Sequence, residues 1–189
     1  MHVTPPITPE TVFQQIDEAK ALEMRNRRLH ELLAHRIPDL HLSISIEAPD
    51  PVACLYRFVV EYVEMAPRLI ECVAACARES RHEHLFAPFI AAATGYFVRP
   101  SILLSRYEGM ESLLIKAYQV HRLMEEMAEN NRSIRNSQLV DVEMTQANLL
   151  AHNLIGEPFA NEVDQAILVT VCQIAGSPDY YELNLDPFV

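Results

Sequence analysis

The segment from Pro51 to about Arg78 is apolar on nearly every side of a helix, and no other feature constrains the fold as much. Its charged residues fall on one line at helical spacing, namely Arg57, Glu61, Glu64, Arg68, Glu71 and Arg78. A helix with so narrow a polar face is stable only where other helices cover most of its surface. We therefore predict a helical bundle with this segment at its centre, and we expect Pro67 to kink the helix or divide it.

Start and stop signals predict the remaining helices. Thr8 is a candidate N-cap and Pro9 suits the first helical position, so a first helix is expected over 9–36, before Pro38. The others are expected over 85–98, over 101–130 either continuous or broken near Gly109, over 139–155, and from Pro158 to Gly176. A chain of 189 residues fits one domain. The predicted fold class is mainly α, a single-domain bundle spanning 1–189 with about five to seven helices.

Two short segments alternate apolar and polar residues with a period of two, which is the pattern of a half-buried strand. One lies near 40–47 and contains Leu42 and Ile44, and the other lies near 180–186 and contains Leu183. A single strand cannot satisfy its backbone hydrogen bonds, so we expect the two to pair. They predict a minor two-stranded β ribbon, formed within one chain or shared between the two copies of a dimer.

The helix predicted over 9–36 carries a short heptad seam. Val12, Ala19, Asn26 and Leu33 recur every seven residues, and Leu22 and Leu29 lie three positions after two of them. A polar residue such as Asn26 within a seam is a device that sets the register of paired helices. One interpretation is an arm used in self-association, which would make the protein a homo-oligomer, most simply a dimer. The other is an amphipathic helix packed on its own bundle.

The charge balance disfavours several classes of partner. Fifteen Lys and Arg against 26 Asp and Glu give a formal net charge of −11 with neutral histidine, which repels phosphate backbones and anionic membranes. We expect neither a nucleic-acid nor a membrane partner, and the conspicuous uncharged run over 85–98 is too short to span a bilayer. No secretory signal follows Met1, and the four cysteines lie in apolar helical sequence as free thiols. These features predict a soluble, cytoplasmic protein.

Histidine and glutamate residues form the best candidate for chemistry. Glu79 and His82 make an E-x-x-H, the spacing with which ferritin-like di-iron bundles place a carboxylate and an imidazole on one helical face. His121 falls within an apolar stripe of the helix over 101–130, and Glu125 lies one turn further along. Together these four side chains would suit iron, manganese or zinc. The chain has no second E-x-x-H, so the alternative is that His121 and Glu125 form a buried hydrogen-bonded pair. A third polar line, formed by Asp141, Thr145, Asn148 and His152, crosses the following helix.

Three functions stay open, because the common nucleotide-binding and nucleophile motifs are absent from the sequence. The first is a non-catalytic, self-associating helical protein with an interaction or regulatory role, whose partner is a second copy or another protein. The second is a non-haem, metal-dependent oxidoreductase with the Glu/His site. The third is a bundle that binds an apolar small molecule in a pocket lined by Met110, Met124, Met127 and Met144 with Tyr107 and Tyr118.

Overall fold

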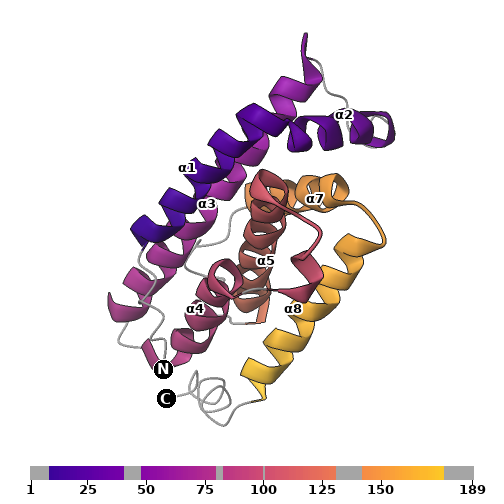
Figure 1. Ribbon diagram of the computed structural model, residues 1–189. Helices are drawn as coiled ribbons and strands as arrows, with labels where there is room; N and C mark the ends of the chain where they lie inside the picture. Colours follow the sequence, from indigo (N-terminus) through magenta and orange to yellow (C-terminus); the bar gives the residue numbers. More distant parts are fainter. Residues whose placement is uncertain (1–8, 41–47, 80–82, 100, 131–141, 177–189) are drawn as a thin grey trace.

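The computed structural model describes residues 9–40, 48–79, 83–99, 101–130 and 142–176 (Figure 1). These residues form one bundle with seven α-helices, one short 3-10 helix and no strand. The elements are α1 (Pro9–Asn26), α2 (Arg28–Leu40), α3 (Pro51–Glu79), α4 (Glu83–Val98), η1 (Ile102–Leu104), α5 (Gly109–Asn130), α7 (Val142–Ile155) and α8 (Phe159–Ala175). The predicted mainly α, single-domain bundle is confirmed. The predicted ribbon lies outside the described residues except for Leu40, which we expected in a strand and which ends α2.

Helix α5 occupies the centre of the bundle, and α3 does not, contrary to our prediction. Each of the other six described α-helices contacts α5, whereas α3 contacts α1, α2, α4 and α5 (Figure 1). The polar residues of α5 make its central position in the bundle hard to predict from the sequence. Glu111, Gln119, His121 and Glu125 are all buried, although each would suit a solvated helix face.

The helix predicted over 9–36 is divided into α1 and α2 at Arg27, whose φ is +53°. The carboxylate of Glu23 explains the break, because it turns back to the start of α2 and accepts hydrogen bonds from the backbone N–H groups of Leu29 and His30, each at 3.0 Å. It thereby satisfies donors that a new helix leaves without partners. A single long helix would leave this carboxylate, which is now 3% exposed, without these donors.

The apolar seam of the first two helices is used within the chain. Val12 and Ala19 of α1 are buried, and α1 packs against α3 and α5. Leu29 and Leu33 of α2 are fully buried, whereas Asn26 is exposed. The structure thus matches the second interpretation of the seam, an amphipathic segment packed on its own bundle.

Two other predicted breaks have different outcomes. Helix α3 runs without interruption through Pro67, which is buried in the core. The apolar contacts of Val63 and Ala66, both fully buried, hold the helix together across the hydrogen bond that a proline removes. Near Gly109 the break is real, because η1 ends at Leu104 and α5 starts at Gly109, whose φ is +55°.

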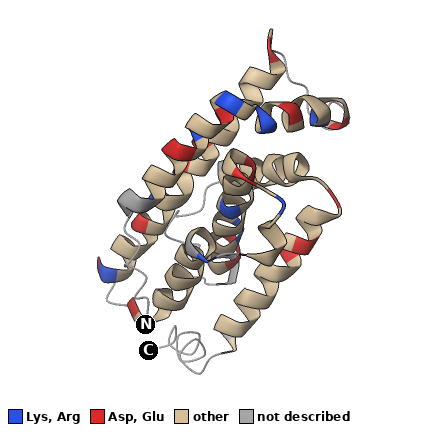
Figure 2. Cartoon of the chain, in the orientation of Figure 1, with Lys and Arg blue, Asp and Glu red and all other residues tan. Residues whose placement is uncertain are grey.

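Charged residues are distributed unevenly over the helices. They are frequent on α1 and α2, whereas Glu83 is the sole acidic or basic residue of α4, and α8 has none after Asp164 (Figure 2). By length and composition alone, one described segment, Glu83–Leu104, is apolar enough to cross a membrane. In the bundle, the α4 part of this segment packs against α3 and α5 and buries Phe89 and Phe97.

Candidate functional site

The structure describes three of the four residues predicted to bind a metal, and these three do not come together. Glu79 is exposed at the end of α3, and His82 lies outside the described residues. His121 and Glu125 are buried in α5, where the ring of His121 stacks on Tyr62 of α3. Glu79 follows Tyr62 by 17 residues in the same helix, which is about 25 Å along its axis. Within the described part of the chain, no group of three or more His, Cys, Asp or Glu side chains could hold a metal ion.

His121 is held as a neutral ring. Its Nε2 lies 3.1 Å from the backbone oxygen of Tyr62, and the two rings stack with centroids 4.2 Å apart. A carbonyl oxygen only accepts, so Nε2 carries the proton and donates it. Burial lowers the pKa of His121 to about 4, against the opposing effects of this hydrogen bond and of Glu125. Its Nδ1 is buried without a hydrogen-bond partner among the residues that the structure describes.

Glu125 is held as an ionised carboxylate, and its partners are not His121. Thr145 donates a hydrogen bond at 2.6 Å and Asn148 donates one at 2.8 Å, both from α7. Arg122 forms a close ion pair with the same carboxylate. Burial raises the pKa of Glu125, but these three hydrogen bonds outweigh burial and leave the pKa below its ordinary value. The prediction that His121 and Glu125 form a hydrogen bond with each other is therefore wrong, although both side chains are buried as expected.

A network of hydrogen bonds and ion pairs extends from Glu125 to α8 around a cavity of about 250 Å³. Tyr118 donates a hydrogen bond to Asp164 at 2.7 Å, and His152 lies 3.4 Å from the other oxygen of that carboxylate. Arg122 lies 3.6 Å from Asp164 and so joins the two carboxylates. We call the whole set the polar cluster; its members are Tyr62, Tyr118, His121, Arg122, Glu125, Thr145, Asn148, His152 and Asp164.

The polar cluster is built to connect helices rather than to move protons. Every pKa that is clearly shifted in it moves away from neutrality. Burial raises the pKa values of Tyr62 and Tyr118, and burial lowers that of His121. The carboxylate of Glu125 raises the pKa of Arg122 despite burial. General acid–base catalysis works best with a pKa near the working pH. The cluster instead ties α3, α5, α7 and α8 together through hydrogen bonds between their side chains.

Sequence reasoning found part of this cluster. The line of polar residues on the helix over 139–155 supplies Thr145, Asn148 and His152, so its helical spacing was a true signal, while Asp141 lies outside the described residues. Tyr62 and Asp164 were missed. Tyr62 lies within the apolar segment that forms α3, and nothing in its local sequence indicates that its hydroxyl donates to Asn148 at 2.7 Å.

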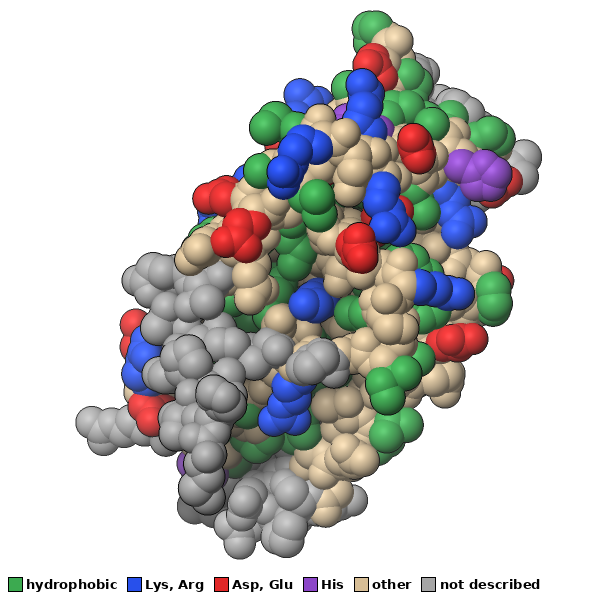
Figure 3. Space-filling model, in the orientation of Figure 1, with side chains coloured by type: hydrophobic (Ala, Val, Ile, Leu, Met, Phe, Trp, Pro, Cys, Tyr) green, Lys and Arg blue, Asp and Glu red, His purple; other side chains and the backbone are tan. Residues whose placement is uncertain are grey.

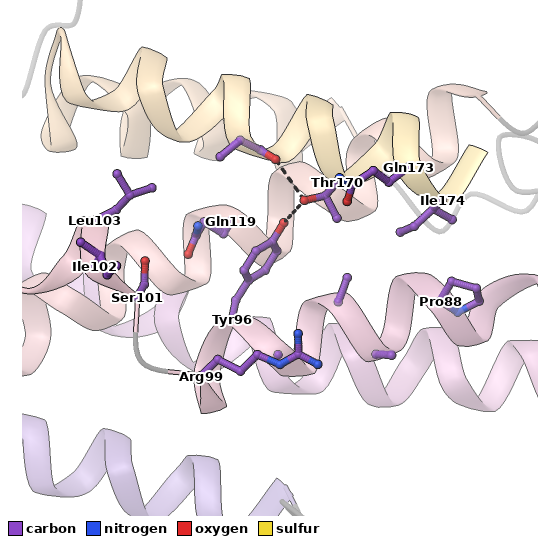
Figure 4. Close-up of a pocket in the computed structure, with 14 residues that line it drawn as sticks. Pro88, Tyr96, Arg99, Ser101, Ile102, Leu103, Gln119, Thr170, Gln173 and Ile174 are labelled. Atoms are coloured by element: carbon purple, nitrogen blue, oxygen red, sulfur yellow. Dashed lines mark hydrogen bonds between the residues drawn. The ribbon is translucent and has the colours of Figure 1, made fainter. Parts of the chain in front are cut away.

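A groove between α4 and α8 forms a second, open site, with α5 as its floor (Figure 4). Its volume is about 690 Å³. The described lining residues are Pro88, Ala91, Ala92, Gly95, Tyr96, Arg99, Ser101, Ile102, Leu103, Gln119, Ala166, Thr170, Gln173 and Ile174. We call this cavity the α4–α8 groove. The lower part of the face in Figure 3, where α8 runs, carries hydrophobic and uncharged side chains with few charges among them.

Gln119 is the most unusual residue of this groove. It is 6% exposed, yet its amide makes no hydrogen bond to any described residue. Figure 4 shows the amide pointing into the groove, between Ser101 and Tyr96. The hydroxyl groups of Tyr96 and Thr170 have partners, because Tyr96 donates to Thr170 at 3.3 Å and Thr170 donates to the Ala166 carbonyl at 3.0 Å. The Gln119 amide is not among the buried unpaired atoms of the described residues, which are Arg36 Nε and His121 Nδ1, so it is open to the groove and can bind a ligand atom or a water there.

Basic residues accompany Gln119 at this end of the groove. Arg99 lines the groove and has no ion pair with a described residue. Lys116 lies one turn before Gln119 on α5 and donates to the Phe97 carbonyl at 3.2 Å, near the end of α4. Burial lowers the pKa of Lys116. The acidic residues that dominate the chain are absent from the described lining.

Three of the four methionines that we predicted to line an apolar pocket lie in the core. Met110, Met124 and Met127 are fully buried members of the core, and they fill space between the helices. Tyr118 belongs to the polar cluster. The α4–α8 groove uses none of these side chains.

Comparison of the chain with protein-family models, with curated proteins and with solved structures finds no match.

Proposed function

We propose that the protein binds an apolar small molecule in the α4–α8 groove and has a non-catalytic role. The observation that carries this proposal is the amide of Gln119, which is directed into the groove and has no hydrogen-bond partner among the described residues. Natural ligand sites are mostly apolar cavities of about 300–1,000 Å³ with a few converging polar groups. The volume and lining of the groove fit this description.

The chemistry of the lining favours binding over catalysis. No His, Cys, Asp, Glu or Lys occurs among the described lining residues. Thr170 and Tyr96 are already engaged in hydrogen bonds, and no base lies beside either hydroxyl to activate it as a nucleophile. This arrangement supports the third function that the sequence left open, at a place other than the one predicted.

The neutral fluorescent dye N-phenyl-1-naphthylamine tests this proposal. We expect saturable binding of one dye per chain, followed by its fluorescence. Ala92→Phe fills part of the groove and should weaken binding about tenfold or more, because an aromatic ring then occupies ligand space. Ala53→Phe is the matched control, since Ala53 is exposed on α3, which contributes no residue to the groove.

Removal of the Gln119 amide gives a second test. Gln119→Leu should change the free energy of unfolding by less than about 1 kcal/mol, because the amide has no hydrogen-bond partner among the described residues and an apolar group of similar shape replaces it. A clear loss of stability would contradict the proposal, since it would mean that the amide has a structural partner. Unchanged dye binding in Ala92→Phe would also contradict it.

Self-association is the rival use of this surface. Ile102, at the mouth of the groove, is 93% exposed, and Val169 of α8 is also exposed. If this surface joined two copies of the chain, light scattering would give the mass of a dimer, and dye binding per chain would fall as the protein concentration rises. That result would overturn the proposal in favour of self-association.

A further inference from the structure

We infer that the ligand of the α4–α8 groove is an amphipathic carboxylate with an unbranched aliphatic chain. This inference rests on the proposed function and adds the chemical class of the ligand and its orientation. The carboxylate binds at the Arg99–Gln119 end of the groove, and the aliphatic chain extends toward Pro88 and Ile174 (Figure 4).

The sign of the charge in the groove selects an anion. Arg99 is the sole charged residue in the described lining, although acidic residues outnumber basic ones by 26 to 15 in the whole chain. Its guanidinium forms no ion pair within the described part of the chain, so it is free to bind a carboxylate with two parallel hydrogen bonds.

The end of α4 is also prepared for a negative group. A helix C-terminus carries a partial negative charge from its unpaired carbonyl groups, which would repel a carboxylate. Lys116 donates to the Phe97 carbonyl and so offsets this charge in the turn from which Arg99 extends. Lys116 has no acidic partner among the residues that the structure describes, so its positive charge is not cancelled.

Figure 4 places Ser101 and Gln119 toward one end of the groove, with Ile102 and Leu103 beside Ser101, and it places Pro88, Ile174 and Gln173 toward the other. Between Arg99 and Pro88, the part of the lining that α4 supplies is mostly apolar and consists of Tyr96, Gly95, Ala92 and Ala91. The Gln119 amide can donate to a carboxylate oxygen at the floor. Arg99 and Pro88 are 11 residues apart on α4 and its following residue, which is about 16 Å along a helix axis. Dodecanoate has a length suited to this span.

The experiment is displacement of N-phenyl-1-naphthylamine by dodecanoate and by dodecan-1-ol, at pH 8 and below the concentration at which either forms micelles. The alcohol has the same chain and no charge. We expect dodecanoate to bind about tenfold or more tightly than the alcohol. Arg99→Gln should lower the affinity for dodecanoate about tenfold and leave the affinity for dodecan-1-ol unchanged. Gln119→Leu should also lower the affinity for dodecanoate. Arg68→Gln is the control, because Arg68 is exposed on α3 and its replacement changes the charge by the same amount.

The outcomes separate this inference from the proposed function. Equal affinity for the acid and the alcohol, with the dye still bound in the groove, would overturn the carboxylate inference alone. If the dye does not bind to the groove and neither compound has an effect, both the carboxylate inference and the proposed function are overturned. Sedimentation of the protein with phosphatidylcholine vesicles, without binding of free dodecanoate, would show that the apolar surface meets a membrane and would also overturn the inference.

Discussion

Gly156 ends α7 with a φ of +82°, and the space where a side chain would lie is filled by Arg36 of α2. A Cβ placed on Gly156 would lie 2.2 Å from one guanidinium nitrogen. That nitrogen donates a hydrogen bond to the Ile155 carbonyl at 3.0 Å. A basic group in this position satisfies a carbonyl that the helix end leaves unpaired. Because Gly156 has no side chain, Arg36 of α2 can reach the end of α7 and connect the two helices.

We predict that Gly156→Ala lowers the free energy of unfolding by at least about 2 kcal/mol, because alanine is strained at this φ and collides with Arg36. Gly95→Ala is the contrasting variant. A Cβ there would lie 3.7 Å from Arg99 in ordinary contact, so a gain of about 0.5–1 kcal/mol is expected from helix propensity. Urea unfolding followed by circular dichroism measures both, and equal effects of the two substitutions would contradict this account of Gly156.

His121 makes the stability depend on pH. Burial lowers the pKa of His121 to about 4 in the folded protein, whereas an unfolded histidine has a pKa near 6.5. Between pH 6.5 and pH 4, His121 is protonated in the unfolded chain but neutral in the folded protein. The free energy of unfolding therefore falls by about 3 kcal/mol as the pH drops from 6.5 to 4. Glu125, whose pKa is lowered, adds a further loss below its unfolded value. Besides burial, the backbone carbonyl of Tyr62 and the carboxylate of Glu125 act on His121, and both oppose the lowering of its pKa.

The variant His121→Gln tests this linkage. Its amide can still donate to the Tyr62 carbonyl, but it does not titrate. We expect the slope of unfolding free energy against pH to become clearly shallower between pH 6.5 and 4.5. A slope identical to that of the wild type would mean that other groups cause the acid sensitivity.

At the level of elements, the break between α1 and α2 shows how one carboxylate can end a helix. Glu23 accepts from the first backbone donors of α2 and lies 2.7 Å from Nδ1 of His30, whose ring stacks on Tyr56 of α3. The turn requires Arg27 to adopt a left-handed conformation, which is costly for any residue with a side chain.

Glycine at position 27 should therefore stabilise the protein. We predict that Arg27→Gly raises the free energy of unfolding by about 1 kcal/mol, since glycine adopts this φ without strain. Arg25→Gly, two residues earlier within α1, should lower the free energy of unfolding by about 1 kcal/mol. Thermal and urea unfolding distinguish the two cases. A continuous helix over 9–36 would make both substitutions destabilising.

The elements that could be predicted from the sequence are those with local signals. Pro158 and Gly176 bound α8 as expected, and the apolar segments became α3 and α4. Local signals did not reveal the break at Arg27, because Glu23 looks like any solvated glutamate until the chain turns back on it. They also misplaced the centre of the bundle, since the polar side chains of α5 become compatible with burial only through partners on other helices.

The sites follow the same rule. His121 and Glu125 could be recognised as inward-facing from helical spacing alone. Their partners could not be recognised in this way, because they come from α3 and α7. Gln119 gave no signal at all. Its unpaired amide is a property of how α4, α5 and α8 pack, and a polar residue on a helix carries no local mark of that environment.

At the level of the whole molecule, polarity is divided between two regions. The polar cluster joins α3, α5, α7 and α8 through hydrogen bonds, which favours one packing arrangement. On another side, α4 and the second half of α8 carry no acidic residue after Glu83 and Asp164, and they enclose the α4–α8 groove (Figure 2). The first region connects four helices, and the second is the groove in which we propose that a ligand binds.

The most direct test of the central claim is a nuclear magnetic resonance titration of the labelled full chain with N-phenyl-1-naphthylamine, in which the side-chain amide signals of Gln119 are assigned by their loss in Gln119→Leu. We predict that these signals shift on addition of the dye, together with backbone signals of Ala92, Tyr96 and Thr170. Signals of the exposed side of α3 should stay unchanged. Shifts confined to α1 and α3, with the Gln119 amide unaffected at saturation, would contradict the account.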